Sequence, residues 1–130
     1  MKIKFIVNPI SGNKKQKNIK QLIFENIDKN LFEYDIEFTT KRKEAGLICK
    51  QAILEKYEAI IAVGGDGTVN EISSELISTK IPMGIIPAGS GNGFALHMGI
   101  NKDINLAINQ LNKHKIKLVD SCKVDKYSFI

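Results

Sequence analysis

The sequence predicts an α/β fold of three layers (αβα), in which a mostly parallel, doubly wound sheet lies between two layers of helices. Three observations predict it. Along the chain, segments whose apolar residues repeat at the spacing of a strand alternate with segments whose apolar residues repeat at the spacing of a helix. The connections between them are short. Residues 59–63 form a continuous apolar run, which is typical of a parallel strand covered by helices on both faces.

The composition is that of one globular domain spanning residues 1–130. With 43% hydrophobic and 25% charged residues, the chain can bury a core, which excludes collagen-like, low-complexity and disordered classes. The formal net charge of +5 suits an anionic ligand, nucleic acid or an acidic membrane face, but it is also ordinary for a lysine-rich protein.

Cysteine spacing and hydropathy indicate a cytoplasmic protein. Cys49 and Cys122 are far apart and show neither a disulfide framework nor metal-ligand spacing, so we expect buried reduced thiols. The longest apolar run is too short to span a bilayer. Asn8-Pro9 interrupts the N-terminal segment before the apolar region of a signal peptide could form.

The first half of the chain contains two predicted strand–helix pairs. Residues 2–8 are rich in β-branched residues and end before Pro9, which cannot continue a central strand. Residues 17–30 repeat apolar side chains at helical spacing, residues 34–39 alternate as a strand does, and residues 44–56 place apolar side chains on one helical face.

The second half continues the alternation after the apolar strand. Helical spacing resumes at residues 68–78, and a short buried strand is closed by Pro87. The predicted elements are strands at residues 59–63, 83–86, 116–124 and 127–130, and helices at residues 68–78, 94–98 and 102–112.

Small polar residues and glycines follow the first four predicted strands. The four segments are Ser11-Gly12, Thr39-Thr40, residues 64–68 and residues 89–93. Because the carboxyl ends of parallel strands meet at one edge, and ligands bind there near the point where strand order reverses, we expect these loops to open on one rim.

Gly64-Gly65-Asp66-Gly67-Thr68 carries the strongest functional signal. Its glycines let the backbone approach a ligand closely, and a helix starting near Thr68 would direct N–H groups at a phosphate. Asp66 repels phosphate, so its expected use is to hold a metal ion or its water shell. A structural alternative stays open, in which Asp66 and Thr68 cap the helix and Thr68-x-x-Glu71 forms a capping box.

The other loops are weaker signals taken alone. Pro87-Ala88-Gly89-Ser90-Gly91-Asn92 offers a hydroxyl and an amide, but alone it would more often be a connector. A Walker-type phosphate loop is absent, and Phe94 stands where a dinucleotide fingerprint needs its third glycine. The basic runs at residues 14–17 and 41–43 could attract ATP or an anionic membrane, or simply be solvated.

Three motifs in order resemble the catalytic domain of the diacylglycerol kinase and sphingosine kinase type of lipid kinase. They are Asn8-Pro9-Ile10-Ser11-Gly12, the run GGDGTVNE at residues 64–71, and IPAGSGN at residues 86–92. The resemblance covers essentially the whole chain. NAD kinases and phosphofructokinases share the fold and the GGDG core, but the NPxSG start and Asn70-Glu71 favour the lipid-kinase branch.

The resemblance implies a nucleotide site for ATP and Mg²⁺. Asp66 is the implied catalytic residue and lies near the Mg²⁺, and spacing to Ala45 selects Thr39 over Thr40. The residues implied to bind the nucleotide are Asn8, Pro9, Ser11, Gly12, Thr39, Gly64, Gly65, Asp66, Gly67, Thr68, Asn70, Glu71, Gly89, Ser90 and Asn92. At Gly93 and Leu96 the family often carries Asp and Arg, so no contacts are transferred there.

The implied function is transfer of the γ-phosphoryl group of ATP to a hydroxyl of diacylglycerol or a related lipid such as a sphingoid base, as in phospholipid biosynthesis. The implied partners are a nucleotide and a lipid at a membrane surface, where the cytoplasmic protein would bind peripherally, with no nucleic acid. Two alternatives remain: a non-catalytic nucleotide-binding or regulatory module, and an NAD kinase-like phosphotransferase.

One feature of the family is absent from the sequence. In these kinases a β-rich C-terminal domain follows and supplies the general base and much of the lipid pocket, whereas the chain stops at Ile130. We therefore expect the N-terminal half of a kinase, inactive alone. The acceptor lipid, any extension past Ile130 and the oligomeric state, including a homodimer, stay open.

Overall fold

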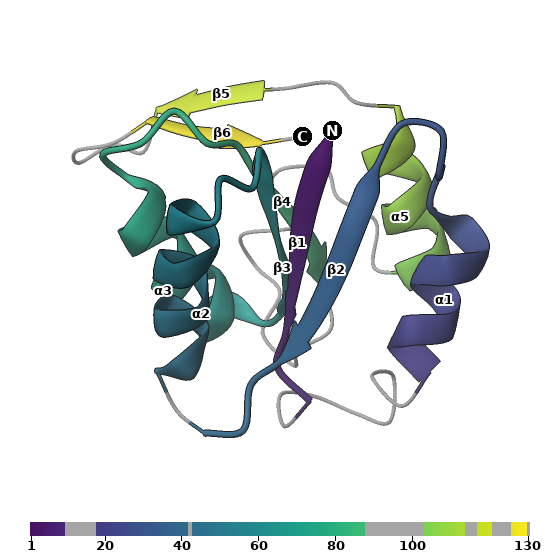
Figure 1. Cartoon of the computed structure of the whole chain (residues 1–130), viewed down its shortest axis with the longest axis horizontal. Helices are drawn as coiled ribbons and strands as arrows, with labels where there is room; N and C mark the ends of the chain where they lie inside the picture. Colours follow the sequence, from purple (N-terminus) through teal and green to yellow (C-terminus); the bar gives the residue numbers. More distant parts are fainter. Residues whose placement is uncertain (10–17, 42, 88–102, 114–116, 121–125, 130) are drawn as a thin grey trace.

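A computed structural model describes residues 1–9, 18–41, 43–87, 103–113, 117–120 and 126–129, the last two ranges as backbone only. Its centre is a six-stranded sheet with the strand order β2-β1-β3-β4-β6-β5 (Figure 1). The strands are β1 (Lys2–Val7), β2 (Glu33–Phe38), β3 (Ala59–Gly64), β4 (Met83–Pro87), β5 (Lys117–Asp120) and β6 (Lys126–Phe129).

Strands β1 to β4 are parallel to their neighbours, as predicted. Strand β6 also runs parallel to β4, which it meets at Met83 and Phe129, whereas β5 and β6 pair antiparallel. The mostly parallel sheet is therefore confirmed.

Helices cover both faces of the sheet and complete the three predicted layers. In Figure 1, α1 (Ile19–Asn26) and α5 (Ile104–Asn112) lie on one side, and α2 (Glu44–Leu54) and α3 (Asp66–Leu76) lie on the other. The predicted helix at residues 94–98 lies outside the described residues.

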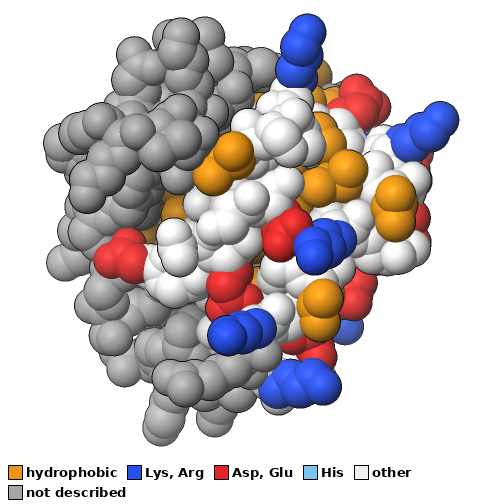
Figure 2. Space-filling model, turned by 90° about the vertical axis from the view of Figure 1, so that its left-hand side faces the viewer, with side chains coloured by type: hydrophobic (Ala, Val, Ile, Leu, Met, Phe, Trp, Pro, Cys, Tyr) orange, Lys and Arg blue, Asp and Glu red, His pale blue; other side chains and the backbone are white. Residues whose placement is uncertain are grey.

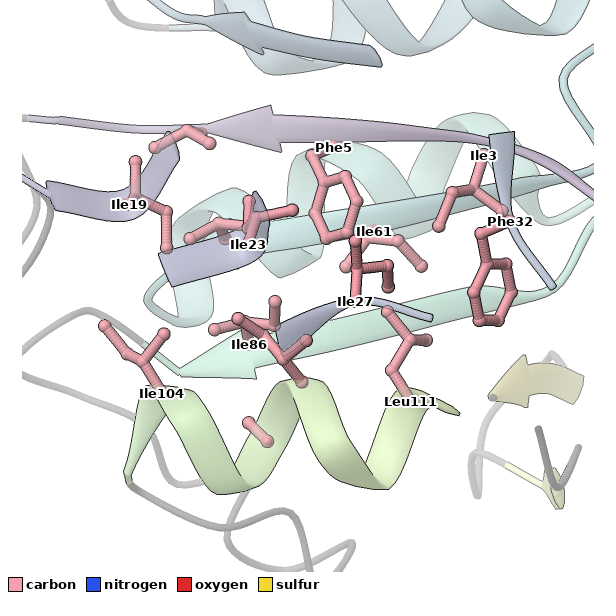
Figure 3. Packing of buried hydrophobic residues seen from close by; sticks show 14 of the residues in the cluster. Ile3, Phe5, Ile19, Ile23, Ile27, Phe32, Ile61, Ile86, Ile104 and Leu111 are labelled. Atoms are coloured by element: carbon pink, nitrogen blue, oxygen red, sulfur yellow. The ribbon is translucent and has the colours of Figure 1, made fainter. Parts of the chain in front are cut away.

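The alternation of side chains along β1 and β3 divides the core into two clusters. Phe5 and Ile61 face α1 and α5, where they pack with residues such as Ile23, as Figure 3 shows. Ile6 and Ile60 face α2 and α3. All of these side chains are fully buried, which explains why both strands read as continuous apolar runs.

Helix α3 begins earlier than the sequence indicates. Its first residue is Asp66, and Gly65 occupies the N-cap position in an extended conformation, with no side-chain capping hydrogen bond. Thr68 therefore lies inside the first turn, and the capping-box interpretation of Thr68 and Glu71 is wrong.

Helix α1 is shorter than the predicted residues 17–30. It ends at Asn26 because Ile27 is already extended, with ψ of 140°. The side chain of Ile27 is still buried in the core, so its apolar character extends the helical pattern beyond the helix itself.

A buried lysine joins β1 to the edge strand β2. The Lys4 side chain is 7% exposed, and its Nζ lies 3.1 Å from Oδ2 of Asp35 and 3.0 Å from Oε1 of Glu37. Burial alone would lower the pKa of Lys4, but its hydrogen bonds to Glu37 and Asp35 raise it overall. The hydrogen bond from Lys4 lowers the pKa of Asp35.

Replacing Asp35 with asparagine should lower the free energy of unfolding at pH 7 by about 1 kcal/mol, since Asp35 is exposed and Glu37 still pairs with Lys4. A lowered pKa in the folded state means that the carboxylate stabilises the fold above the ordinary aspartate pKa of about 3.9. That contribution is lost as the pH falls through the lowered value. Urea unfolding should therefore show a difference that shrinks below about pH 4. Glu33→Gln, an exposed change on the same strand, is the control, and an equal effect of both variants at pH 7 would contradict the account.

Two glycine replacements should shift stability in opposite directions. A Cβ on Gly84 would lie 2.7 Å from Cδ1 of Ile61 and 3.4 Å from Cδ1 of Leu111, so Gly84→Ala should cost about 1–3 kcal/mol by overpacking. A Cβ on Gly46 in α2 would meet nothing closer than 3.7 Å, so Gly46→Ala should add about 0.5–1 kcal/mol. Thermal unfolding of both variants measures the difference, and a destabilised Gly46→Ala would show that α2 packs more tightly than described.

Candidate functional site

The strand order reverses between β1 and β3. From β1 the chain passes through α1 to β2 on one side of β1, and it then returns through α2 to β3 on the other side. These two helices lie on opposite faces of the sheet (Figure 1). The carboxyl ends of β1 and β3 therefore border the crevice at which open α/β sheets bind ligands.

Asn8 and Thr68 connect the two sides of this crevice. The backbone N–H of Asn8 donates to the carbonyl oxygen of Val63 (3.0 Å), and its Nδ2 donates to Oγ1 of Thr68 (3.3 Å). Thr68 is only 3% exposed, so this contact fixes the first turn of α3 against the end of β1. Two predicted site residues that are 60 positions apart thus meet at the rim.

The glycine segment, residues 64–68, is partly exposed where β3 passes into α3. Asp66 and Gly67 are exposed and Gly65 is half-buried. Among the described residues, no atom would lie within 4 Å of a Cβ on Gly67, so packing against them does not require a glycine there. The N–H groups of a first helical turn have no partners within the helix, and with the helix dipole they favour an anion at this end.

Thr39 lies at the same edge, at the end of β2. Its backbone N–H donates to the carbonyl oxygen of Val7 (2.8 Å), and the residue is 4% exposed. Thr39 is therefore buried below the surface of this edge of the sheet, whereas Pro9 is exposed there.

Asn70 and Glu71 follow in α3. Asn70 is exposed, and its carbonyl oxygen accepts hydrogen bonds from the hydroxyls of Ser73 and Ser74. Glu71 is half-buried, and its Oε1 is buried without a hydrogen-bond partner among the described residues.

Five of the predicted site residues lie outside the described residues: Ser11, Gly12, Gly89, Ser90 and Asn92. The two loops that carry them follow β1 and β4. The described ends of these strands, Val7 and Pro87, lie at the same edge as Gly64, since Val7 pairs with Val63 and Gly64 pairs with Pro87.

The chain matches the family model described as the diacylglycerol kinase catalytic domain over residues 2–124. The chain belongs to this family. The resemblance of its motifs is thereby confirmed.

Relatives and solved structures agree with this assignment. The chain is 31% identical over 130 residues to a diacylglycerol kinase of Bacillus subtilis, covering 98% of this chain and 43% of that protein. It is 29% identical over 114 residues to sphingosine kinase B of Dictyostelium discoideum, covering 82% of this chain and 15% of that protein. A crystal structure of a diacylglycerol kinase from Bacillus anthracis superposes with a TM-score of 0.73 at 31% identity, covering 91% of this chain and 44% of that one. The chain thus spans less than half the length of these relatives.

Sequence reasoning missed a residue that positions the rim of this kinase-family domain. Both carboxylate oxygens of Glu44 accept from the hydroxyl of Thr40, and Oε1 also accepts from its backbone N–H (2.8 Å). These contacts hold the turn after β2 next to Thr39. The sequence pattern that could have indicated this contact is Thr40 followed four residues later by Glu44, at the start of a predicted helix.

The described cysteine belongs to the core and not to the rim. Cys49 is buried and free, as expected, whereas Cys122 lies outside the described residues. Burial, assisted by the charge of Glu75, raises the pKa of the Cys49 thiol to about 12, so it remains protonated at neutral pH.

The described residues contain neither a cluster of metal-ligating side chains nor a membrane-spanning helix. Within those ranges no group of three or more His, Cys, Asp or Glu side chains is arranged to hold a metal ion. No helix among them is long and apolar enough to cross a membrane.

Proposed function

We propose that this chain is the N-terminal, nucleotide-binding domain of an ATP-dependent lipid kinase. The reaction transfers the γ-phosphoryl group of ATP to a hydroxyl of diacylglycerol or a related lipid such as a sphingoid base. The observation that carries the proposal is the Asn8–Thr68 contact, which places the glycine segment and the start of α3 at the reversal point of the strand order.

The start of α3 is suited to the phosphates of the nucleotide. Backbone N–H groups at the beginning of a helix donate to phosphate oxygens, and the helix dipole favours their negative charge. No atom of the described part of the chain lies within 4 Å of a Cβ built on Gly67, which leaves room for a phosphate beside this turn. Asn8 and Thr68 would hold the turn in place while the phosphates bind.

Asp66 is the proposed ligand of Mg²⁺. It is an exposed carboxylate in the first turn of α3, with no cluster of three metal-ligating side chains around it among the described residues. Such a single carboxylate fits Mg²⁺, which is usually held by one or two carboxylates together with phosphates and waters. When bound, Mg²⁺ would neutralise charge on the phosphates.

Phosphoryl transfer depends mainly on positioning and electrostatic stabilisation. We assign the remaining nucleotide contacts to Asn70, Glu71 and the predicted residues of the loops after β1 and β4. The general base and most of the lipid pocket would lie in a β-rich domain beyond this chain. Residues 1–130 alone should therefore bind the nucleotide but transfer almost no phosphoryl group.

The test is a phosphoryl-transfer assay on the longest natural form of the protein. With Mg²⁺ and ATP we expect phosphorylation of diacylglycerol or sphingosine and none of NAD. Transfer to NAD would favour an NAD kinase-like enzyme, and ATP binding without transfer to any acceptor would favour a non-catalytic module. Absence of nucleotide binding would reject both kinase assignments and leave a regulatory module.

A further inference from the structure

One buried carboxylate oxygen in α3 lacks a hydrogen-bond partner. In the described part of the chain, Oε1 of Glu71 is the only buried side-chain nitrogen or oxygen of this kind. Buried polar atoms in folded proteins are almost all hydrogen-bonded, so an exception needs an explanation, such as a ligand that supplies the partner. An ionised carboxylate can only accept hydrogen bonds, so the missing partner is a donor.

The other glutamates of α2 and α3 already have partners. Glu75, one turn further along α3, has its Oε2 4.0 Å from Nζ of Lys50. Glu44, at the start of α2, accepts hydrogen bonds from Thr40. Figure 2 views the molecule from the side of these two helices and shows acidic and basic side chains interspersed at the surface. The missing partner therefore distinguishes Glu71 from the other glutamates of its helical layer.

Glu71 lies on the side of α3 that borders the crevice. It follows Thr68 by three residues, so both lie on one side of the helix, and Thr68 accepts the hydrogen bond from Asn8 at the rim. The carbonyl oxygen of Glu71 is 3.7 Å from the position of a Cβ on Gly46, so the first turn of α2 is also close. Side chains on a helix lean towards its N-terminus, which in α3 is the end where we place the phosphates.

The Glu71 carboxylate can turn towards a ligand without breaking a hydrogen bond of its buried oxygen. The residue as a whole is only half-buried, so part of it is accessible. Oε1 has no partner to lose, and the last torsion of a glutamate side chain is soft. A donor that arrives with the nucleotide would therefore replace nothing within the described part of the protein.

We propose that Glu71 accepts a hydrogen bond from a ribose hydroxyl of the bound nucleotide and thereby determines its sugar specificity. The inference rests on the proposed function, because it names the part of the nucleotide that this side chain recognises. A carboxylate repels phosphate, whereas the ribose hydroxyls are neutral donors close to the phosphates. Acidic side chains also recognise ribose hydroxyls in α/β folds that bind dinucleotides.

Calorimetric titration of the longest natural form with ATP, 2′-deoxy-ATP and 3′-deoxy-ATP, each with Mg²⁺, tests this contact without an acceptor lipid. At least one deoxy analogue should bind about tenfold or more weakly than ATP, because it leaves the carboxylate unpaired. Glu71→Met removes the acceptor and should bind all three nucleotides within about twofold of one another. Glu71→Gln keeps one acceptor oxygen and should retain part of the preference.

Thermal unfolding separates this role from a structural one. Glu71→Met removes a buried oxygen that has no partner among the described residues, so the variant should be at least as stable as the wild type. Glu75→Met is the matched control, since it makes the same change one turn later on the same side of α3. This control should keep the preference of the wild type for ATP.

Equal binding of the three nucleotides by the wild type, or a sugar preference that persists in Glu71→Met, would overturn the proposal. So would an altered Mg²⁺ dependence of Glu71→Met with an intact sugar preference, since the carboxylate would then accept from water on the metal. If the wild type bound no nucleotide, the proposed function would fail together with this inference. ATP binding without sugar preference would overturn this inference alone.

Discussion

Replacing Asp66 with asparagine should reduce kcat/KM for lipid phosphorylation at least about a thousandfold, a loss of about 4 kcal/mol of transition-state stabilisation. The variant keeps the size of the side chain but removes the charge that we assign to Mg²⁺. Asp66 is exposed at the start of a helix, so we expect the free energy of unfolding to change little, on the order of the 0.3–1 kcal/mol of an interaction with the helix dipole. Steady-state kinetics on the longest natural form and urea unfolding measure the two effects separately.

Asp103→Asn is a control at the start of another helix. The Asp103 carboxylate accepts a hydrogen bond from the backbone N–H of Leu106 (3.1 Å) as the N-cap of α5, and asparagine caps equally well. This variant should retain full activity. If Asp66→Asn also kept activity within a few-fold of the wild type, the assignment of Asp66 to Mg²⁺ would be wrong.

Replacing Gly67 with alanine should weaken ATP binding at least about a hundredfold without destabilising the fold. The added Cβ would project into space that holds no atom of the described residues within 4 Å. The residue lies in the first turn of α3, where alanine is more favourable than glycine, so the free energy of unfolding should stay constant or rise slightly. A bound phosphate would meet this Cβ directly. Calorimetric titration with Mg²⁺ and ATP, together with thermal unfolding, measures both quantities.

Gly46→Ala provides the comparison in the first turn of α2. It adds the same methyl group to a helix that the proposal does not place at the phosphates, so ATP affinity should be unchanged. Tight ATP binding by Gly67→Ala would place the phosphates away from the start of α3.

The sheet could be predicted from the sequence because its central strands are covered on both faces. Every residue of β3 is buried, and an uninterrupted apolar run of strand length that is stopped by glycines is typical of a strand covered on both faces. The edge strand β2 could be predicted equally well, because its residues alternate between exposed and half-buried positions. The start of α3 was misplaced because its N-cap, Gly65, has no side chain that could mark the position by a capping hydrogen bond.

The sequence predicted which loops share one edge of the sheet, but not the side-chain contacts between them. Loops that follow parallel strands must share an edge, so Asn8 and the glycine segment were expected together. The hydrogen bond from Asn8 to Thr68 depends on the exact register of β1 against β3, which no local pattern encodes. The pairing of Lys4 with Asp35 and Glu37 depends in the same way on the register of β1 against β2.

The most direct test of the central claim is nuclear magnetic resonance of the isotopically labelled 130-residue chain during titration with Mg²⁺ and ATP. The account predicts that the backbone amide signals of Asn8, Thr39 and residues 65–68 shift together with one dissociation constant, while those at the opposite ends of the strands, such as Lys2 and Ala59, stay in place. Shifts confined to those opposite ends, or no shift at residues 65–68 at saturating ATP, would contradict it.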